Sequence, residues 1–344
     1  MLNKIFTILF ICLLLIGGTN MTQAKNTNSW DKVFPKSDKV DVQKVSFKNR
    51  FGITLVGDLY IPKNIKKDEK LAAIAVSGPF GAVKEQASGL YAQTLAQRGF
   101  ITLAFDPSYT GESSGELRNI ASPDINTEDF SAAVDYLSTQ KNVNPERIGI
   151  LGICGFGGFA LNAAAIDTRI KATVTSTMYD MTRVSAYGYN DVMDENARYN
   201  LKETLNKQRT EDFKTGTYAK ADGLPEKLTG NEPQFVKDYY GYYKTPRGFH
   251  KRSINSNGNW NLTSSLSLIN QPILAYASEI KTPVLMLHGE NAHSRYFSEG
   301  AFKKLTGNNK ALLIIKDANH VDLYDNLEKI PFDKIEEFYK ENLK

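Results

Sequence analysis

The sequence has few side chains that form covalent cross-links or act as bases. Its 344 residues include only two cysteines and four histidines. Cys12 lies in an apolar N-terminal segment that we expect to be removed, which leaves Cys154 as the single cysteine of the mature chain. An intramolecular disulfide is thereby excluded. A lone thiol is either a buried apolar filler or a functional group.

The sequence also lacks a strong charge imbalance and a long apolar run. Its net charge is +4 and its lysines are spread without a basic block, so we infer no nucleic-acid partner. The apolar run from 5 to 16 is shorter than the roughly 20 residues of a spanning helix. Thr22-Gln-Ala24 can serve as a cleavage site, so we predict a signal peptide over residues 1–24. The protein would then be exported, periplasmic or secreted, without stable membrane insertion; the alternative is a permanent N-terminal anchor.

Short apolar segments alternate with helical patterns through the first half of the chain. Strands are predicted at 71–76, 100–105, 147–152 and 170–176, and helices at 86–98 and 127–139. This alternation predicts an α/β fold with a doubly wound, mostly parallel sheet and functional residues at the strand carboxyl ends. A hairpin over 41–62 would add an antiparallel edge.

The alternation stops at residue 181 and resumes near 283. We therefore predict a core formed by residues 41–180 and 272–344, preceded by a lead-in over 25–40. Residues 181–271 are rich in tyrosine and largely helical in pattern, and we interpret them as an inserted cap. These tyrosines either cover a substrate or belong to ordinary surface packing.

Cys154 occupies a distinctive position within the glycine-rich stretch from Ile148 to Ala160. Ile148, Gly149, Ile150 and Leu151 lead into Gly152, Cys154 follows after Ile153, and three more glycines precede an alanine-rich helical segment. A sharp strand-to-helix turn exposes the side chain at its apex beside the helix N-terminus, where amides stabilise a developing anion. Because a free thiol is only slightly ionised at neutral pH, it needs a nearby base.

Chain order selects the base among the four histidines. His320 follows the last predicted strand, at 311–315, as expected when nucleophile, acid and base occupy successive strand-end loops. The carboxylate that orients it is predicted to be Glu290, with Asp180 as the alternative. The amide of Gly155 would be one oxyanion donor. The other should come from the loop after Val76, at Phe80 or a neighbour, because Pro79 has no amide hydrogen.

The ordered motifs resemble the α/β-hydrolase superfamily, in its dienelactone hydrolase-like branch with cysteine nucleophiles. They are Ser77-Gly-Pro, Asp106-Pro-Ser-Tyr-Thr-Gly-Glu-Ser-Ser-Gly, Gly152-Ile-Cys154-Gly-Phe-Gly-Gly, Gly289-Glu-Asn-Ala-His-Ser and Asn319-His320. The chain is also similar to exported bacterial proteins of this kind and to fungal polyketide transferases. It departs from the family at Phe156, where the turn usually has glycine, and at Ala292, where many relatives have aspartate.

The predicted function is hydrolysis of an ester, thioester or lactone through an acyl intermediate on Cys154. The alternatives are an acyltransferase or peptidase of the same fold, or a binding protein that retains the fold without turnover. We expect a small-molecule acyl substrate and no cofactor. His288 and His293 are not joined by a Cys or Asp cluster, so no metal site is predicted. The sequence gives no indication of the oligomeric state.

Overall fold

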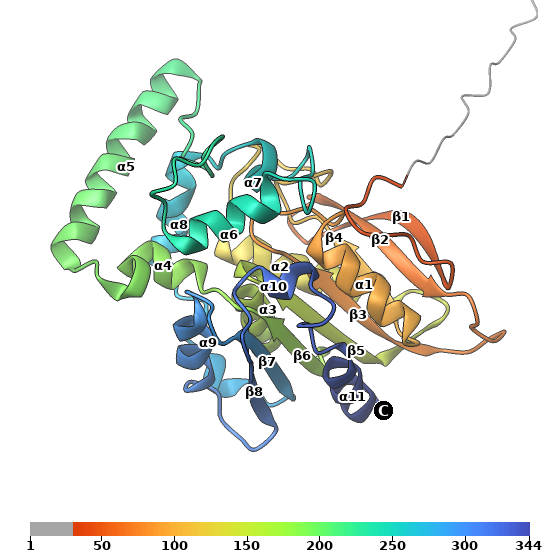
Figure 1. Cartoon of the computed structure of the whole chain (residues 1–344). Coiled ribbons are helices and arrows are strands. Elements are labelled where there is room, and N and C mark those ends of the chain that lie inside the picture. Colours follow the sequence, from red (N-terminus) through yellow and green to blue (C-terminus); the bar gives the residue numbers. More distant parts are fainter. Residues whose placement is uncertain (1–29) are drawn as a thin grey trace, which may run out of the picture. The chain divides into compact units, whose positions relative to one another are not determined.

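The computed structural model describes residues 30–344, of which residues 32–344 form one compact unit (Figure 1). The predicted signal peptide lies outside the described residues, as does the first part of the lead-in. Within the described chain, eight strands form one sheet in the order β1-β2-β4-β3-β5-β6-β7-β8. They are β1 (Val40–Lys48), β2 (Thr54–Pro62), β3 (Leu71–Ser77), β4 (Ile101–Phe105), β5 (Val143–Ile153), β6 (Ala172–Ser176), β7 (Val284–Gly289) and β8 (Lys310–Ile315).

The sheet is parallel from β4 to β8, and β2 runs antiparallel to both of its neighbours. The predicted hairpin is confirmed, since β1 pairs with β2 from Val40 opposite Pro62 to Lys48 opposite Thr54. The central strands β4, β6 and β7 are buried at every residue. Their continuous apolar or small side chains therefore match a sheet that is covered on both faces.

Two pairs of helices cover this sheet. Helix α1 (Ala87–Gln97) contacts α11 (Phe332–Asn342), and α2 (Pro123–Ser138) contacts α3 (Gly155–Ile166). Figure 1 shows the two pairs on opposite faces. The predicted doubly wound α/β architecture is confirmed. Helix α2 begins four residues earlier than predicted, because Pro123 fits the first helical turn and Asp124 complements the helix dipole.

A long helical segment joins β6 to β7 and contains the residues predicted to form a cap. Its elements are α4 (Met181–Tyr187), η1 (Tyr189–Asp191), α5 (Glu195–Thr215), α6 (Gln234–Tyr243), α7 (Ile254–Asn257), η2 (Leu262–Ser264), α8 (Ser265–Asn270) and η3 (Ala277–Glu279). It lies beyond the carboxyl ends of the central strands (Figure 1). Two further helices, α9 (Arg295–Phe302) and α10 (Asp322–Asp325), follow β7 and β8. Among the described residues, no helix combines the length and apolar character that crossing a membrane requires.

Candidate active site

Cys154 lies at the apex of the turn between β5 and α3. It follows Ile153 and precedes Gly155, and its φ of 55° and ψ of −126° lie in a region that non-glycine residues rarely adopt. The amide of Cys154 donates to the carbonyl oxygen of Ser176 at 3.0 Å, and the amide of Tyr179 donates to the carbonyl oxygen of Cys154 at 2.8 Å. These bonds from the end of β6 hold the strained turn in place.

The bulky residue at position 156 is accommodated from the opposite side of the turn. The Phe156 ring is buried against Phe130 and Phe159, with ring centroids 6.2 and 5.2 Å away. A Cβ atom at Gly78 would lie 2.8 Å from the Phe156 Cβ and 2.3 Å from the Ile153 carbonyl oxygen. The space that a glycine usually leaves at position 156 is therefore provided by Gly78 in the facing loop.

Cys154 is 7% exposed, and its sulfur lies beside three groups that can hydrogen-bond to it. Burial raises the pKa of the thiol, while the Tyr324 hydroxyl and the amides of Gly155 and Phe80 act in the opposite direction by hydrogen bonding. The two amides predicted as oxyanion donors thus both lie beside the sulfur atom. Because burial dominates, the resting sulfur is a neutral thiol.

The His320 imidazole is also buried, at 2% exposed, and makes its hydrogen bonds to hydroxyl groups. Its Nε2 atom lies 3.0 Å from the Tyr324 Oη atom. Its Nδ1 atom lies 2.5 Å from the Ser294 Oγ atom and 3.0 Å from the Thr177 Oγ1 atom. The structure therefore places Tyr324 between the predicted nucleophile and the predicted base.

The electrostatic setting of His320 favours its neutral form. Burial lowers its pKa well below the usual range, and the nearby rings of His293 and His288 lower it further. Their ring centroids lie 5.3 and 6.1 Å from that of His320. Burial also lowers the pKa of His288 to about 3 and that of His293 to about 4. The thiol and the imidazole are therefore a neutral pair at rest.

Neither predicted carboxylate reaches His320, which corrects both assignments of the acid. Glu290 is exposed, and its Oε2 atom accepts the amide of Asp317 at 3.1 Å at the edge between β7 and β8. Asp180 caps α4, where its Oδ1 atom accepts the amides of Thr182 and Arg183 at 3.0 and 2.9 Å. Within residues 30–344, none of the hydrogen bonds of His320 goes to a carboxylate.

A cavity of ≈ 240 Å³ opens beside the thiol. Its walls are apolar and aromatic, with no Asp, Glu, Lys or Arg among the lining residues, and most of them come from the helical segment between β6 and β7. The lining residues are Phe80, Cys154, Tyr179, Met181, Val184, Leu224, Phe235, Tyr239, Tyr243, Asn255, His293 and Tyr324. A cavity of this kind holds a small uncharged group.

The helical segment also fixes the loop that carries Phe80. The Asn255 Nδ2 atom donates to the Phe80 carbonyl oxygen at 2.7 Å, and the Asn255 amide donates to the Gly81 carbonyl oxygen at 3.1 Å. The Phe80 ring stacks on Trp260 with centroids 4.2 Å apart. These contacts hold the loop at Phe80, the residue whose amide lies beside the Cys154 sulfur.

A buried charged cluster anchors the same loop at its other end. The Lys84 Nζ atom lies 2.7 Å from Glu85, 3.0 Å from Asp106 and 2.5 Å from Glu112, and Arg252 lies 2.6 Å from Glu85. Burial opposes the charge of Lys84, but the adjacent carboxylates outweigh it and raise its pKa. The cluster ties the loop after β3 to the loop after β4.

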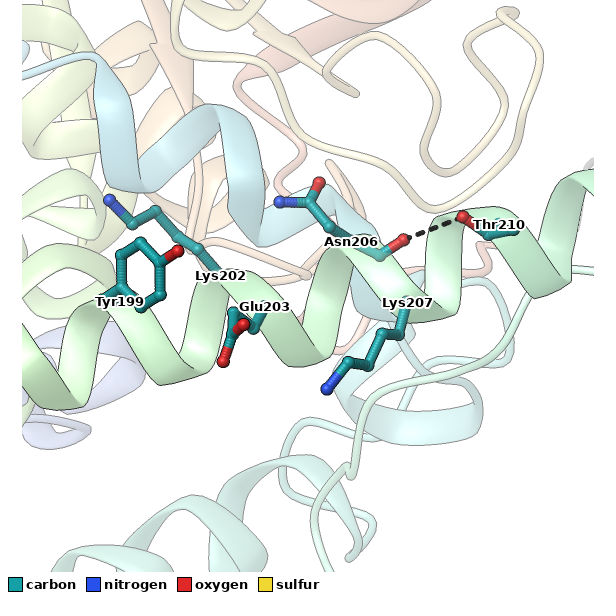
Figure 2. A pocket seen from close by; sticks show the side chains of 6 residues that line it. All are labelled: Tyr199, Lys202, Glu203, Asn206, Lys207 and Thr210. Carbon is teal, nitrogen blue, oxygen red and sulfur yellow. Dashed lines mark hydrogen bonds between the residues drawn. The ribbon is translucent and has the colours of Figure 1, made fainter.

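A larger hollow, of ≈ 530 Å³, lies along α5 and is lined by side chains of that one helix (Figure 2). Its residues are Tyr199, Lys202, Glu203, Asn206, Lys207 and Thr210. Side chains from a single helix face cannot converge on a ligand from several sides. Among the described residues, no group of three or more His, Cys, Asp or Glu side chains is arranged to hold a metal ion.

Sequence reasoning missed four residues that surround His320: Tyr324, Ser294, Thr177 and His288. Tyr324 lies four residues after His320, a spacing that places two side chains on one face of a helical turn. That spacing is visible in the sequence. The other three follow or end the neighbouring strands, and only the strand order shows that they meet.

Comparisons with known proteins agree with this architecture. The family described as X-Pro dipeptidyl-peptidase (S15 family) matches residues 52–322. The uncharacterized protein PA2218 of Pseudomonas aeruginosa is 58% identical over 328 residues, which cover 95% of this chain and 87% of that protein. Its crystal structure has a TM-score of 0.89 and covers 92% of this chain and 98% of that one.

Two fungal proteins are more distant. The thiohydrolase aneE of Aspergillus aculeatus is 32% identical over 132 residues, which cover 38% of this chain and 40% of that protein. The crystal structure of the α/β hydrolase GrgF from Penicillium sp. sh18 is 20% identical, with a TM-score of 0.72, and covers 88% of this chain and 99% of that one. The structural similarity to GrgF shows that this chain has the α/β-hydrolase fold.

Proposed function

Since this chain belongs to the X-Pro dipeptidyl-peptidase (S15) family of hydrolases, with the α/β-hydrolase fold, we propose that it cleaves an uncharged ester, thioester or lactone through an acyl-cysteine intermediate. Cys154 would be the nucleophile and His320 the general base. The observation that carries the proposal is the meeting of the strained Cys154 turn, two amide donors and the Tyr324–His320 pair at one cavity.

Activation of the thiol would proceed through Tyr324. In the neutral resting state the thiol proton is donated to the Tyr324 oxygen, and the Tyr324 hydroxyl donates to Nε2 of His320. As the sulfur attacks the carbonyl carbon, the thiol proton passes to the Tyr324 oxygen and the hydroxyl proton passes to Nε2. Tyr324 thus remains neutral, as its pKa requires: burial and the nearby Cys154 raise it well above the usual range.

The remaining steps use the same groups. The amides of Phe80 and Gly155 would donate to the carbonyl oxygen as it becomes negative. The leaving oxygen or sulfur takes the proton from His320 as its bond to the carbonyl carbon breaks. Water, deprotonated by His320, then attacks the thioester formed with Cys154, which releases a carboxylic acid and restores the thiol. If an alcohol or amine attacks instead of water, the same intermediate supports acyl transfer.

The cavity supports a small uncharged acyl group. Its volume of ≈ 240 Å³ is below the range of about 300–1,000 Å³ for drug-sized ligands, and no charged side chain lines it. We propose that residues 181–271 act as a cap, since they supply most of the lining. The aneE relative is named a thiohydrolase, which supports including thioesters among the substrates.

Peptide cleavage is the second candidate, because the matching family is named for X-Pro dipeptidyl-peptidase activity. A dipeptidyl-peptidase substrate presents a free terminal ammonium group on the first of the two residues that precede the cleaved bond, so the site must hold this charge together with the dipeptide. Burying that charge needs a carboxylate partner, and no Asp or Glu lines the cavity. This favours an uncharged acyl substrate over a peptide N-terminus.

The test compares the mature protein with Cys154→Ala and His320→Ala on three substrates: p-nitrophenyl acetate, a short acyl thioester and Ala-Pro-p-nitroanilide. We expect turnover of the first two by the wild type, with a loss of at least about 100-fold in either variant. Intact-mass measurement should detect an acetyl adduct that Cys154→Ala does not form. Faster cleavage of the anilide than of the esters would select the peptidase, and equal rates for all three proteins would overturn the enzymatic role of Cys154.

A further inference from the structure

The Ser294 hydroxyl, which contacts Nδ1 of His320, belongs to a buried series of hydrogen bonds. The Ser294 Oγ atom lies 2.5 Å from Nδ1 of His320 and 2.9 Å from Nε2 of His288. The Nδ1 atom of His288 lies 2.6 Å from the Ser298 Oγ atom. His288, Ser294 and Ser298 are each 0% exposed. The chain therefore extends from the base to α9 without contact with solvent.

The protons of this chain can be assigned from the role of the base. If Nε2 of His320 accepts a proton, its Nδ1 must carry one and donate it to the Ser294 oxygen. The Ser294 hydroxyl is then free to donate to Nε2 of His288. This leaves Nδ1 of His288 protonated, and it donates to Ser298. Each hydrogen bond from His320 through Ser294 and His288 to Ser298 then has one donor and one acceptor. All of them are satisfied when each group donates to the next in that order.

Thr177 provides a second oxygen for the same Nδ1 atom. Its φ is 46°, in the left-handed region that β-branched residues rarely adopt, and its amide donates to the Leu287 carbonyl oxygen at 2.7 Å. Such strain concentrates at functional sites. Cys154, at the end of the adjacent strand β5, is strained in the same sense. The two strained positions thus supply the nucleophile and an oxygen that orients the base.

We propose that Ser294, Thr177, His288 and Ser298 replace the carboxylate of a catalytic triad with a neutral hydroxyl and imidazole relay. Ser294 and Thr177 would hold His320 in the Nδ1–H tautomer, and His288 and Ser298 would fix the direction in which Ser294 donates. The proposal rests on the proposed role of His320 as the base. All four are positioning residues, since they act through His320 and do not line the cavity.

The relay differs from a carboxylate in its response to charge. A carboxylate selects the tautomer and also stabilises the imidazolium by its negative charge. Hydroxyl and imidazole groups can select the tautomer but offer only dipoles to the cation. The loss of one link should therefore cost less than the ~10⁴-fold loss in kcat seen when a triad carboxylate is made an amide.

The first experiment uses the full mature protein and paired variants of the relay. We expect Ser294→Ala to lower kcat for the acyl thioester about 10- to 100-fold with little change in KM, and Ser294→Thr, which keeps the hydroxyl, to retain more activity. The amide of His288→Gln keeps a polar atom near the position of Nε2, which faces Ser294, whereas that of His288→Asn keeps one near the position of Nδ1, which faces Ser298. We therefore expect His288→Gln to retain more activity than His288→Asn. Ser267→Ala, which removes a hydroxyl bonded to the backbone carbonyls of Ala121 and Ser264 and not part of the relay, is the matched control.

The second readout separates orientation from packing. The acidic limb of the kcat/KM profile should move to lower pH by about 0.5–1 unit in Ser294→Ala, since the imidazolium loses an acceptor for its Nδ1–H. The titratable groups around His320 that would be shared by wild type and variant are Cys154, Tyr179, Tyr239, Tyr324, His288 and His293.

The third readout does not need turnover. Imidazole ¹⁵N chemical shifts should show His320 as the Nδ1–H tautomer in the wild type and a mixture of tautomers in Ser294→Ala. An Nε2–H tautomer in the wild type, or a pH limb and ¹⁵N shifts that stay unchanged in Ser294→Ala, would overturn the relay. A wild type that hydrolyses no ester or thioester would instead refute the proposed function, and the ¹⁵N shifts would still test the relay.

Discussion

The Tyr324 hydroxyl lies 3.0 Å from Nε2 of His320 and also hydrogen-bonds to the Cys154 thiol. The predicted nucleophile and base are therefore connected by hydrogen bonds through a third side chain. This arrangement makes a specific demand on the tyrosine: its oxygen must accept one proton and release another without becoming charged.

Removal of this hydroxyl is expected to slow the chemical step. Tyr324→Phe should lower kcat for an acyl thioester about 10- to 100-fold, because the proton loses its path from sulfur to Nε2, while KM changes little. Tyr242→Phe is the control, since Tyr242 packs edge-on against Tyr324 with ring centroids 5.1 Å apart. Steady-state kinetics of both variants check this prediction, and equal activities in the two would contradict it.

The thiol is expected to react slowly at neutral pH. Because burial raises the pKa of Cys154, the thiolate fraction at pH 7 should be smaller than that of a free cysteine, whose pKa is about 8.5. Alkylation by iodoacetamide should therefore rise continuously from pH 7 to pH 9 in the folded protein. The same protein unfolded in urea provides the reference rate. A plateau of reactivity below pH 7 would instead indicate a thiolate–imidazolium pair.

The loop that carries Phe80 is expected to depend on Asn255. Asn255→Ala removes the bond to the Phe80 carbonyl oxygen, so the Phe80 amide should be less well directed at the oxyanion and kcat should fall about 10-fold or more. Asn257→Ala changes an exposed asparagine on the same short helix and is the matched control. The prediction fails if both variants keep the wild-type kcat for p-nitrophenyl acetate.

A stability prediction concerns Asp129, away from the active site. Its carboxylate accepts four hydrogen bonds from Asn49, Ser108 and Asn126, at 2.6–3.2 Å. Asp129→Asn places an amide donor against these donors, so we expect the free energy of unfolding at pH 7 to fall by about 1–3 kcal/mol. Asp135→Asn, on the exposed side of the same helix, is the control for urea unfolding.

The raised pKa of Asp129 also predicts how the stability of the protein depends on pH. Burial raises the pKa of Asp129 from 3.8 to about 6, although its hydrogen bonds act in the opposite direction. Between about pH 4 and 6 the folded protein thus binds a proton that the unfolded chain does not, and this contribution to stability is lost as pH rises through about 6. The deficit of Asp129→Asn should therefore be larger at pH 5 than at pH 7. A smaller deficit at pH 5 would contradict the direction of the pKa shift.

The sequence predicted the fold well because the relevant signals are local. Alternation of buried strands and helices identifies a parallel sheet, and the glycines around Cys154 identify the sharp turn. The position of His320 after the last strand also follows from chain order. The structure confirms the sheet and the turn and places the two side chains on either side of Tyr324.

The orienting groups could not be predicted in the same way, because they depend on how neighbouring loops meet. Glu290 is the only carboxylate in its loop, but it faces the exposed edge of the sheet. Ser294, four residues later, faces Nδ1 of His320. Side-chain chemistry favours a carboxylate as the partner of an imidazole. The backbone path of the loop, however, determines which side chain lies next to Nδ1 of His320.

The absence of charged side chains from the cavity beside Cys154 has a consequence for the end of the reaction. Hydrolysis converts an uncharged ester or thioester into a carboxylic acid that is ionised at neutral pH. The cavity has neither an arginine nor a lysine to hold that anion, and burying an unpaired carboxylate is strongly unfavourable. We therefore expect product release to be fast and product inhibition to be weak. Apolar walls that bind the uncharged substrate do not retain the carboxylate that hydrolysis forms from it.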